Sequence, residues 1–246
     1  MSKLVKMVER ELFLERGLDE GAPLSAARVA SILRSRKSPP NHAFDRFLAP
    51  ELRAVSRQYW TPLAVAARAA EWIDELAIQT VFDVGSGAGK FCVAAALAGH
   101  ARFVGIEQRA RLVAAARELA RVFEVEARVT FIHGKFDGTL LPNAEAYYFY
   151  NSFGENLFSR EDCLDDDAEL SDARYLGDIA AAEQLLRQAA VGTYLLTYNG
   201  FGGQVPDGYA QVRVEPNFPC VLEMWRKLEP SRLVRASDSR PAAEQA

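Results

Sequence analysis

Hydrophobic positions follow two alternating patterns from residue 62 onward. Short apolar runs bounded by glycine or polar residues predict buried strands, and apolar residues spaced three or four apart predict helices. The predicted strands are 80–84, 102–106, 129–133, 146–150, 193–198, 209–214 and 220–227. The predicted helices between them are 62–76, 90–98, 112–123 and 175–190. This alternation predicts a doubly wound α/β fold around a mostly parallel sheet of seven strands, with a closing hairpin that adds an antiparallel strand.

The first 58 residues form a predicted helical extension, with helices at 3–18 and 24–33. The extension either packs as decoration on the main domain or acts as a lid that helps to choose the substrate. The main domain is predicted over 59–235, and its first helix has Thr61 as N-cap and Pro62 in its first turn. The polar tail 236–246 is expected to be frayed.

Composition narrows the class of protein. The 246 residues are 49% hydrophobic and 25% charged with a net charge of −4, which is ordinary for a globular domain. Without a dense run of Lys and Arg, nucleic acid is an unlikely partner. The three cysteines and three histidines show no disulfide or metal-ligand spacing, so no metal is expected. No apolar run approaches the ~20 residues of a membrane span, and a cytoplasmic location is expected. The oligomeric state stays open.

The most informative segment is VFDVGSGAGK, residues 81–90, which joins a predicted strand to a predicted helix. Its glycines leave room for a nucleoside to approach outward-pointing backbone N–H groups. Glu107 ends the next strand, where its carboxylate can accept hydrogen bonds from ribose hydroxyls. A dinucleotide site prefers G-x-G-x-x-G, whereas this loop reads G-x-G-x-G and follows Asp83. An anion there suits a ligand that has an amino group and no phosphates.

The loop and its acid closely resemble motif I of the class I methyltransferases, which have a Rossmann-like fold and use S-adenosyl-L-methionine. The resemblance implies that S-adenosyl-L-methionine is the cofactor. Residues of the loop would line its methionine end, and Glu107, followed by Gln108, would hold its ribose. The implied loop residues are Asp83, Gly85, Ser86, Gly87 and Gly89.

A second element of the resemblance lies at the end of the fourth predicted strand. Tyr150-Asn151-Ser152-Phe153 resembles the family's N-P-P-Y element, and its N-x-F form is closer to the class I (non-SET) histone-lysine methyltransferases. By that resemblance Asn151 and Phe153 are catalytic, and Asn151 also contacts the cofactor. Tyr59 and Thr61 loosely echo a Tyr and a Thr that those enzymes carry before motif I.

The adenine end of the cofactor is predicted after the third strand. Relatives often carry an acid directly after the glycine of this segment, but the sequence reads His133-Gly134-Lys135-Phe136-Asp137. A charged lysine cannot accept a hydrogen bond, so Asp137 or the backbone would receive the adenine amino group. Phe136 would stack on the ring, or else belong to the ordinary core.

The resemblance implies a methyltransferase that acts on a nitrogen, in a protein lysine or a small-molecule amine. An inactive cofactor-binding or scaffolding protein of the same fold is one alternative. An NAD-dependent oxidoreductase is another, disfavoured by the loop spacing. The role of the acidic run 161–169 has two interpretations: it is a solvated loop, or it attracts a cationic substrate. Residues 197–203 are rich in glycine and aromatic residues and could form a rim of the acceptor pocket.

Overall fold

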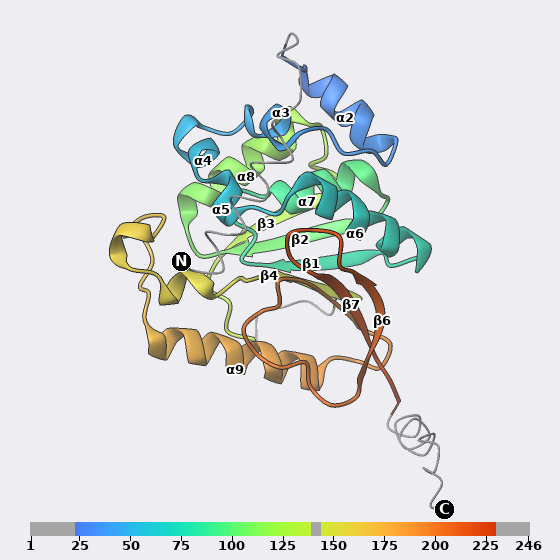
Figure 1. Ribbon diagram of the computed structural model, residues 1–246, viewed down its shortest axis with the longest axis vertical. Helices are drawn as coiled ribbons and strands as arrows, with labels where there is room; N and C mark the ends of the chain where they lie inside the picture. Colours follow the sequence, from blue (N-terminus) through green and yellow to red (C-terminus); the bar gives the residue numbers. More distant parts are fainter. Residues whose placement is uncertain (1–22, 139–143, 230–246) are drawn as a thin grey trace, which may run out of the picture.

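A computed structural model describes residues 23–138 and 144–229 of the chain. Its centre is one seven-stranded sheet in the order β3-β2-β1-β4-β5-β7-β6 (Figure 1). The pairs among β1 to β5 are parallel, and β7 pairs antiparallel with both β5 and β6. The strands are β1 Thr80–Val84, β2 Arg102–Glu107, β3 Val129–His133, β4 Ala146–Tyr150, β5 Tyr194–Tyr198, β6 Tyr209–Glu215 and β7 Leu222–Lys227. The predicted sheet, including its closing hairpin, is confirmed.

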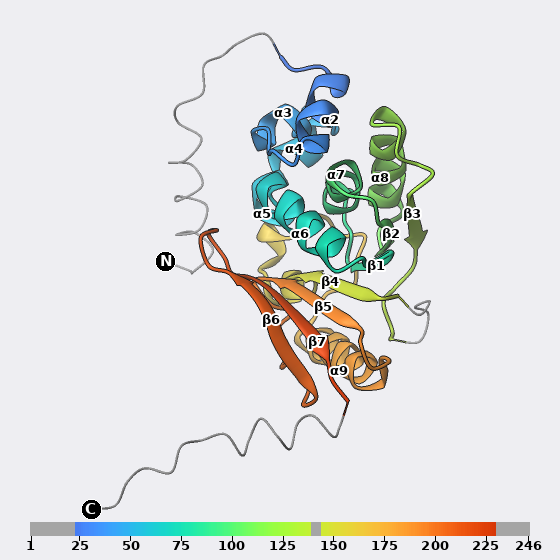
Figure 2. The ribbon, with the colours of Figure 1, turned by 90° about the vertical axis from the view of Figure 1, so that its right-hand side faces the viewer.

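Helices cover both faces of the sheet. Figure 2 shows α6, α7 and α8 on one side and α9 on the other. The helices are α2 Ala26–Arg34, α3 Asn41–Asp45, α4 Pro50–Ala54, α5 Ser56–Tyr59, α6 Leu63–Glu75, α7 Lys90–Ala98, α8 Ala110–Val122 and α9 Asp172–Gln188. Because side chains alternate along a strand, β1 sends Val81 into the core with α7 and Phe82 into the core with α9.

The start of α6 differs from the prediction. Thr61 is not its N-cap: the helix begins at Leu63, whose backbone N–H donates to Asn41 Oδ1 at 2.9 Å. The Thr61 hydroxyl instead shares a hydrogen bond of 2.9 Å with the hydroxyl of Tyr148 on β4. The expected cap was therefore wrong because the donor at the helix start is satisfied by a side chain 22 positions away. A local pattern cannot reveal such a partner.

The described helices of the N-terminal segment share the main core. Phe44 of α3 stacks on Phe123 with ring centroids 4.6 Å apart. Lys90, the first residue of α7, forms a buried ion pair of 2.8 Å with Asp45. The packing described for 23–58 is thus continuous with the sheet domain, and the predicted helix 3–18 lies outside the described residues. Within the described ranges, no helix is long and apolar enough to cross a membrane.

Candidate active site

A cleft opens at the carboxyl ends of β1, β2 and β4, where open α/β folds bind ligands. Eight of the predicted site residues line it: Tyr59, Gly85, Gly87, Glu107, Gln108, Phe136, Asn151 and Phe153. A smaller adjoining pocket is lined by Thr61, Asp83 and Ser86 together with Lys90 and Tyr148. Segments far apart in the sequence therefore meet at one edge of the sheet, and most of the predicted site is brought together there.

The glycine loop packs closely against two neighbours, the aromatic Trp60 and the polar Ser152. Gly85 and Gly87 have φ angles of +76° and +54°, in the region that favours glycine. A Cβ atom on Gly87 would lie 2.3 Å from Cζ3 of Trp60, so the indole ring lies directly against this turn. A Cβ atom on Gly85 would lie 3.2 Å from the Cβ of Ser152. The absence of side chains at these two glycines thus lets Trp60 and Ser152 pack against the loop, while both glycines line the cleft.

Glu107 is held in place by backbone donors. One carboxylate oxygen accepts the Gly87 N–H at 3.1 Å, and the other accepts the Arg109 N–H at 2.9 Å. Burial raises the pKa of this carboxyl, although the two N–H groups oppose that rise. A carboxylate has about four lone-pair sites, so Glu107 keeps acceptor capacity toward the cleft that it lines.

Asp83 is a second buried carboxylate, on the neighbouring strand. The Cys92 thiol donates to its Oδ2 atom at 3.2 Å. Burial raises the pKa of Asp83 to about 7, the Cys92 hydrogen bond opposes the rise, and the charge of Glu107 adds to it. Two buried acids at adjoining strand ends disfavour an anionic ligand and favour one that carries positive charge.

Asn151 begins the loop that follows β4. Its φ angle is +44°, which asparagine tolerates better than most residues, and its N–H donates to the Gly200 carbonyl at 3.0 Å. A Cβ atom on Gly154 would lie 2.3 Å from Asn151 Nδ2, so this glycine makes room for the amide. The segment after β5 therefore positions Asn151, which supports the expectation that 197–203 borders the site.

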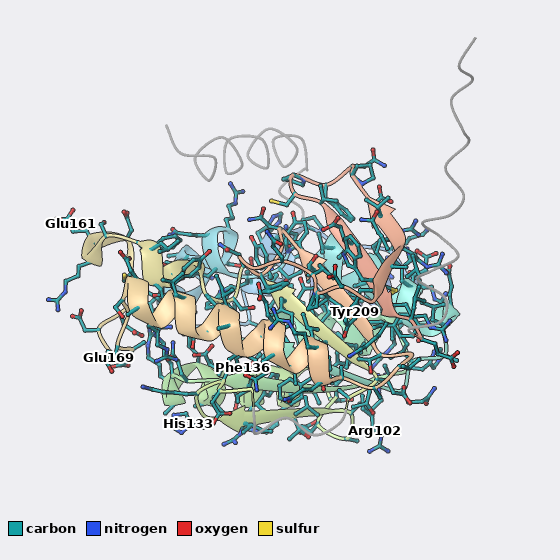
Figure 3. All side chains as sticks on the ribbon, turned by 90° about the horizontal axis from the view of Figure 1, so that it is seen from below. Arg102, His133, Phe136, Glu161, Glu169 and Tyr209 are labelled. Carbon is teal, nitrogen blue, oxygen red and sulfur yellow. The ribbon has the colours of Figure 1, made fainter. Side chains whose placement is uncertain are left out.

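Aromatic side chains form the wall on the α9 side of the cleft. Phe153 stacks on Phe136 with centroids 5.8 Å apart and meets Phe149 at 6.2 Å. Phe136 belongs to the core between the sheet and α9, and Figure 3 views that side of the molecule. Phe136 is thus a core residue that also lines the cleft, and its stacking on adenine stays a prediction.

Two predicted cofactor residues lie away from both linings. Gly89 is required by packing: a Cβ atom there would lie 2.6 Å from Phe131 Cζ and 2.7 Å from the Cβ of Ala116. Asp137 has an exposed side chain and lines neither hollow. Their proposed contacts with a cofactor stay predictions.

The acidic run after Asn151 is partly built into the cleft wall. Asp165 accepts from Arg109 Nε and Arg111 Nε, each at 2.6 Å. Glu161 and Glu169 are exposed at the outer edge of the molecule (Figure 3). The run therefore combines one partly buried, ion-paired residue with solvated charges.

Several cleft residues were not predicted as site residues. Trp60 lies between the predicted residues Tyr59 and Thr61, and it was given no role from the sequence. Arg109 is only two positions after Glu107, and this short spacing could have identified it as a cleft residue. Arg174 of α9 donates to Gln108 Oε1 at 3.2 Å and pairs with Asp178. Nothing local in the sequence links α9 to the end of β2, because only the fold brings them together.

The residues present fit S-adenosylmethionine. Glu107 offers fixed acceptors for ribose hydroxyls, and Asp83 offers a buried carboxylate to an amino group. Ser152 Oγ, beside the glycine loop, is buried and has no hydrogen-bond partner among the described residues. A buried polar atom without a partner is costly, so a ligand at this loop would satisfy it. The pair of acids is a poor match for pyrophosphate.

Comparisons with known proteins bear on the domain and on the fold. Residues 78–148, which contain the glycine loop, match the model of a methyltransferase domain. No curated protein matches the chain. A methyltransferase from Podospora anserina, solved with S-adenosylhomocysteine, has a TM-score of 0.53 at 15% identity, covering 86% of this chain and 100% of that one. Mitomycin 7-O-methyltransferase has a TM-score of 0.50 at 16% identity, covering 92% of this chain and 67% of that one.

The fold is that of the class I, Rossmann-like methyltransferases. The domain match and the fold confirm the predicted enzyme class, an S-adenosylmethionine-dependent methyltransferase, and its cofactor. The matched structures also include an RNA methyltransferase from Salinibacter ruber, with 25% identity, a TM-score of 0.48, and 69% of this chain and 94% of that one covered. The comparisons give no support to the expectation that nucleic acid is an unlikely partner. Because one matched structure is an O-methyltransferase, they also do not single out a nitrogen acceptor.

Proposed function

We propose that this methyltransferase acts on an amine nitrogen, in a protein lysine side chain or a small molecule. The observation that carries the proposal is the place of Asn151 in the cleft. Asn151 directly follows β4 and lines the cleft together with the glycine loop and Phe153. An amide oxygen accepts a hydrogen bond from an N–H donor, which suits an amine nucleophile.

The chain's residues divide the work of binding. Asp83 would hold the amino group of the cofactor, Glu107 would receive its ribose hydroxyls, and Phe136 would lie against its adenine. When bound, the cofactor supplies an electrophilic methyl group on a positively charged sulfur that leaves as a neutral thioether. The leaving group therefore needs no acid, and the protein's main task is alignment. Such alignment supplies about 7–11 kcal/mol in favourable intramolecular reactions.

The surroundings of Asn151 also favour the reactive form of an amine. Only a neutral amine attacks, and a lysine amine has an unperturbed pKa of about 10.4. Phe153 and Phe158 present apolar surface in the cleft, and desolvation disfavours the charged ammonium. The positive sulfonium would act in the same direction. The Asn151 side-chain oxygen then accepts a hydrogen bond from an N–H group of the amine, which orients the nitrogen lone pair toward the methyl group.

The test separates chemistry from cofactor binding. Asn151→Ala is expected to lower turnover at least tenfold while S-adenosylhomocysteine affinity stays within a few-fold, since the lost contact acts on the reacting complex. Asn151→Asp should keep part of the activity if the acceptor arrives as a cation. Asn217→Ala, at an exposed position away from the cleft, is the matched control. Wild-type turnover by Asn151→Ala would refute the assigned role.

A further inference from the structure

Arg109 connects two parts of the cleft through its backbone and its side chain. Its N–H donates to Glu107 Oε1 at 2.9 Å. Its guanidinium reaches across to Glu155 at 2.9 Å and to Asp165 at 2.6 Å. The arginine side chain is only 4% exposed. One buried cation thus ties the ribose-binding end of β2 to the segment that follows β4.

Residues 158–170 of that segment are called the cap loop. Figure 1 shows it in yellow between the end of β4 and the start of α9. It contains a single short 3₁₀ turn, Arg160–Asp162. Phe158, Leu164 and Leu170 line the cleft. A loop of this length without longer regular structure is usually functional.

Polar contacts hold the middle of the cap loop, from Asp162 to Asp165. The Tyr59 hydroxyl donates to the Asp162 carbonyl at 2.6 Å, and the Leu164 N–H donates to Glu155 Oε1 at 2.8 Å. The Asp165 carboxylate accepts hydrogen bonds from both Arg109 and Arg111. Apart from these anchors the loop is largely exposed, including Arg160 and Asp166. The closed position therefore depends more on ion pairs and hydrogen bonds than on a buried apolar core.

We propose that Arg109 is a positioning residue that latches the cap loop over the cofactor cleft, so that the latch sets how fast the cofactor leaves. The inference rests on the cofactor site described above and adds a role for residues outside it. Arg109 contacts Glu107 through its backbone N–H and Asp165 of the cap loop through its side chain. A cofactor that holds Glu107 in place therefore also holds the arginine that anchors the loop. Opening breaks the Asp165 pairs while the sheet and its two cores stay intact.

Release kinetics test the latch. Asp165→Asn removes the charge that pairs with Arg109 and Arg111, and charge-assisted hydrogen bonds are about twice as strong as neutral ones. We expect S-adenosylhomocysteine, displaced by excess S-adenosylmethionine in a stopped-flow experiment, to leave at least tenfold faster. Asp166→Asn makes the same chemical change at the next, exposed position and should release at the wild-type rate. Asp165→Glu, which keeps the charge, should restore much of the slow release.

A second readout follows the loop itself. Trypsin cleavage after Arg160 should be suppressed by S-adenosylhomocysteine in the wild type and in Asp166→Asn, but much less in Asp165→Asn. A folded Asp165→Asn variant with wild-type release and protection would overturn the latch while leaving the cofactor site intact. Failure of the wild type to bind S-adenosylhomocysteine at all would overturn the cofactor site and the latch together. A purely structural role for Asp165 would lower the melting temperature and leave the release rate unchanged, which also counts against the latch.

Discussion

At the scale of single residues, the site is defined by two buried carboxylates that stand close enough to influence each other. Asp83 and Glu107 end adjacent strands, and the charge of Glu107 contributes to the raised pKa of Asp83. Such a pair is unfavourable without a cation nearby. The cofactor carries positive charge on its amino group and its sulfur. The two acids therefore lower the stability of the empty protein and raise its affinity for a cationic nucleoside.

The first residue-scale prediction concerns pH. Burial raises the pKa of Asp83 from 3.8 to about 7. An acid with a raised native pKa takes up a proton on folding, so the empty protein should lose stability as pH rises from about 4 to about 7. Binding runs the other way, because only ionised Asp83 pairs with the ligand's ammonium group. S-adenosylhomocysteine affinity should rise with pH through about 7.

Calorimetric titrations between about pH 5 and about pH 8 check this behaviour. Asp83→Asn should bind more weakly above neutrality and lose most of the pH dependence. Asp74, near the end of α6, pairs with His100 and Arg36 and lines neither hollow, so Asp74→Asn is a control for a general effect of lost charge. A pH dependence that persists unchanged in Asp83→Asn would place the responsible group elsewhere.

The second residue-scale prediction concerns Glu107. Glu107→Ala removes an acceptor for two ribose hydroxyls, and hydrogen bonds to charged groups contribute about 1.5–3 kcal/mol. Cofactor affinity should fall roughly ten- to a hundredfold. The exposed Glu118 of α8 provides the control Glu118→Ala, whose affinity should equal that of the wild type. Unchanged affinity in a folded Glu107→Ala variant argues against the ribose assignment.

At the scale of elements, the glycine loop does more than admit a ligand. The sequence alone predicted that a side chain on Gly87 would obstruct the cofactor. The structure adds the indole of Trp60, which a Cβ atom on Gly87 would approach to 2.3 Å. The loop therefore also depends on how the segment before α6 is packed. Loss of binding in a Gly87 variant can come from this displaced ring as well as from direct obstruction.

A double-mutant cycle separates the two effects. Gly87→Ala should destabilise the wild type by roughly 1–3 kcal/mol, through overpacking and a strained backbone. In a Trp60→Ala background the overpacking disappears, so the same change should cost less. Thermal unfolding of the four proteins gives the coupling energy. Additive effects of the two substitutions would show that Trp60 does not press on the loop in solution.

Elements were predictable from sequence where their pattern is local. Strands β1, β3 and β4 and helix α7 have the predicted bounds, because short apolar runs and a flanking glycine mark them. The cap of α6 was not predictable, since Asn41 reaches it from another helix. Arg174 at the cleft was missed for the same reason. Sequence patterns thus identified the motif residues, whereas partners supplied by tertiary packing required the structure.

At the scale of the whole molecule, the fold separates cofactor binding from acceptor choice. The carboxyl ends of β1 and β2 and the segment after β3 carry most of the residues assigned to the cofactor. The loops after β4 and β5 meet at Asn151, whose N–H donates to the Gly200 carbonyl, and by the proposed function they form the acceptor side. Tyr59, from the N-terminal segment, also reaches the cleft and the cap loop. Acceptor specificity should therefore lie in Tyr59, the cap loop and the segment after β5.

The most direct test of the central claim is to identify the atom that receives the methyl group. The purified protein is incubated with methyl-labelled S-adenosylmethionine and a fractionated lysate, and the labelled product is analysed by mass spectrometry. The account predicts a label on an amine nitrogen that is strongly reduced with Asn151→Ala. A label on oxygen or carbon would contradict it, because an amide acceptor at Asn151 would then have no N–H to orient.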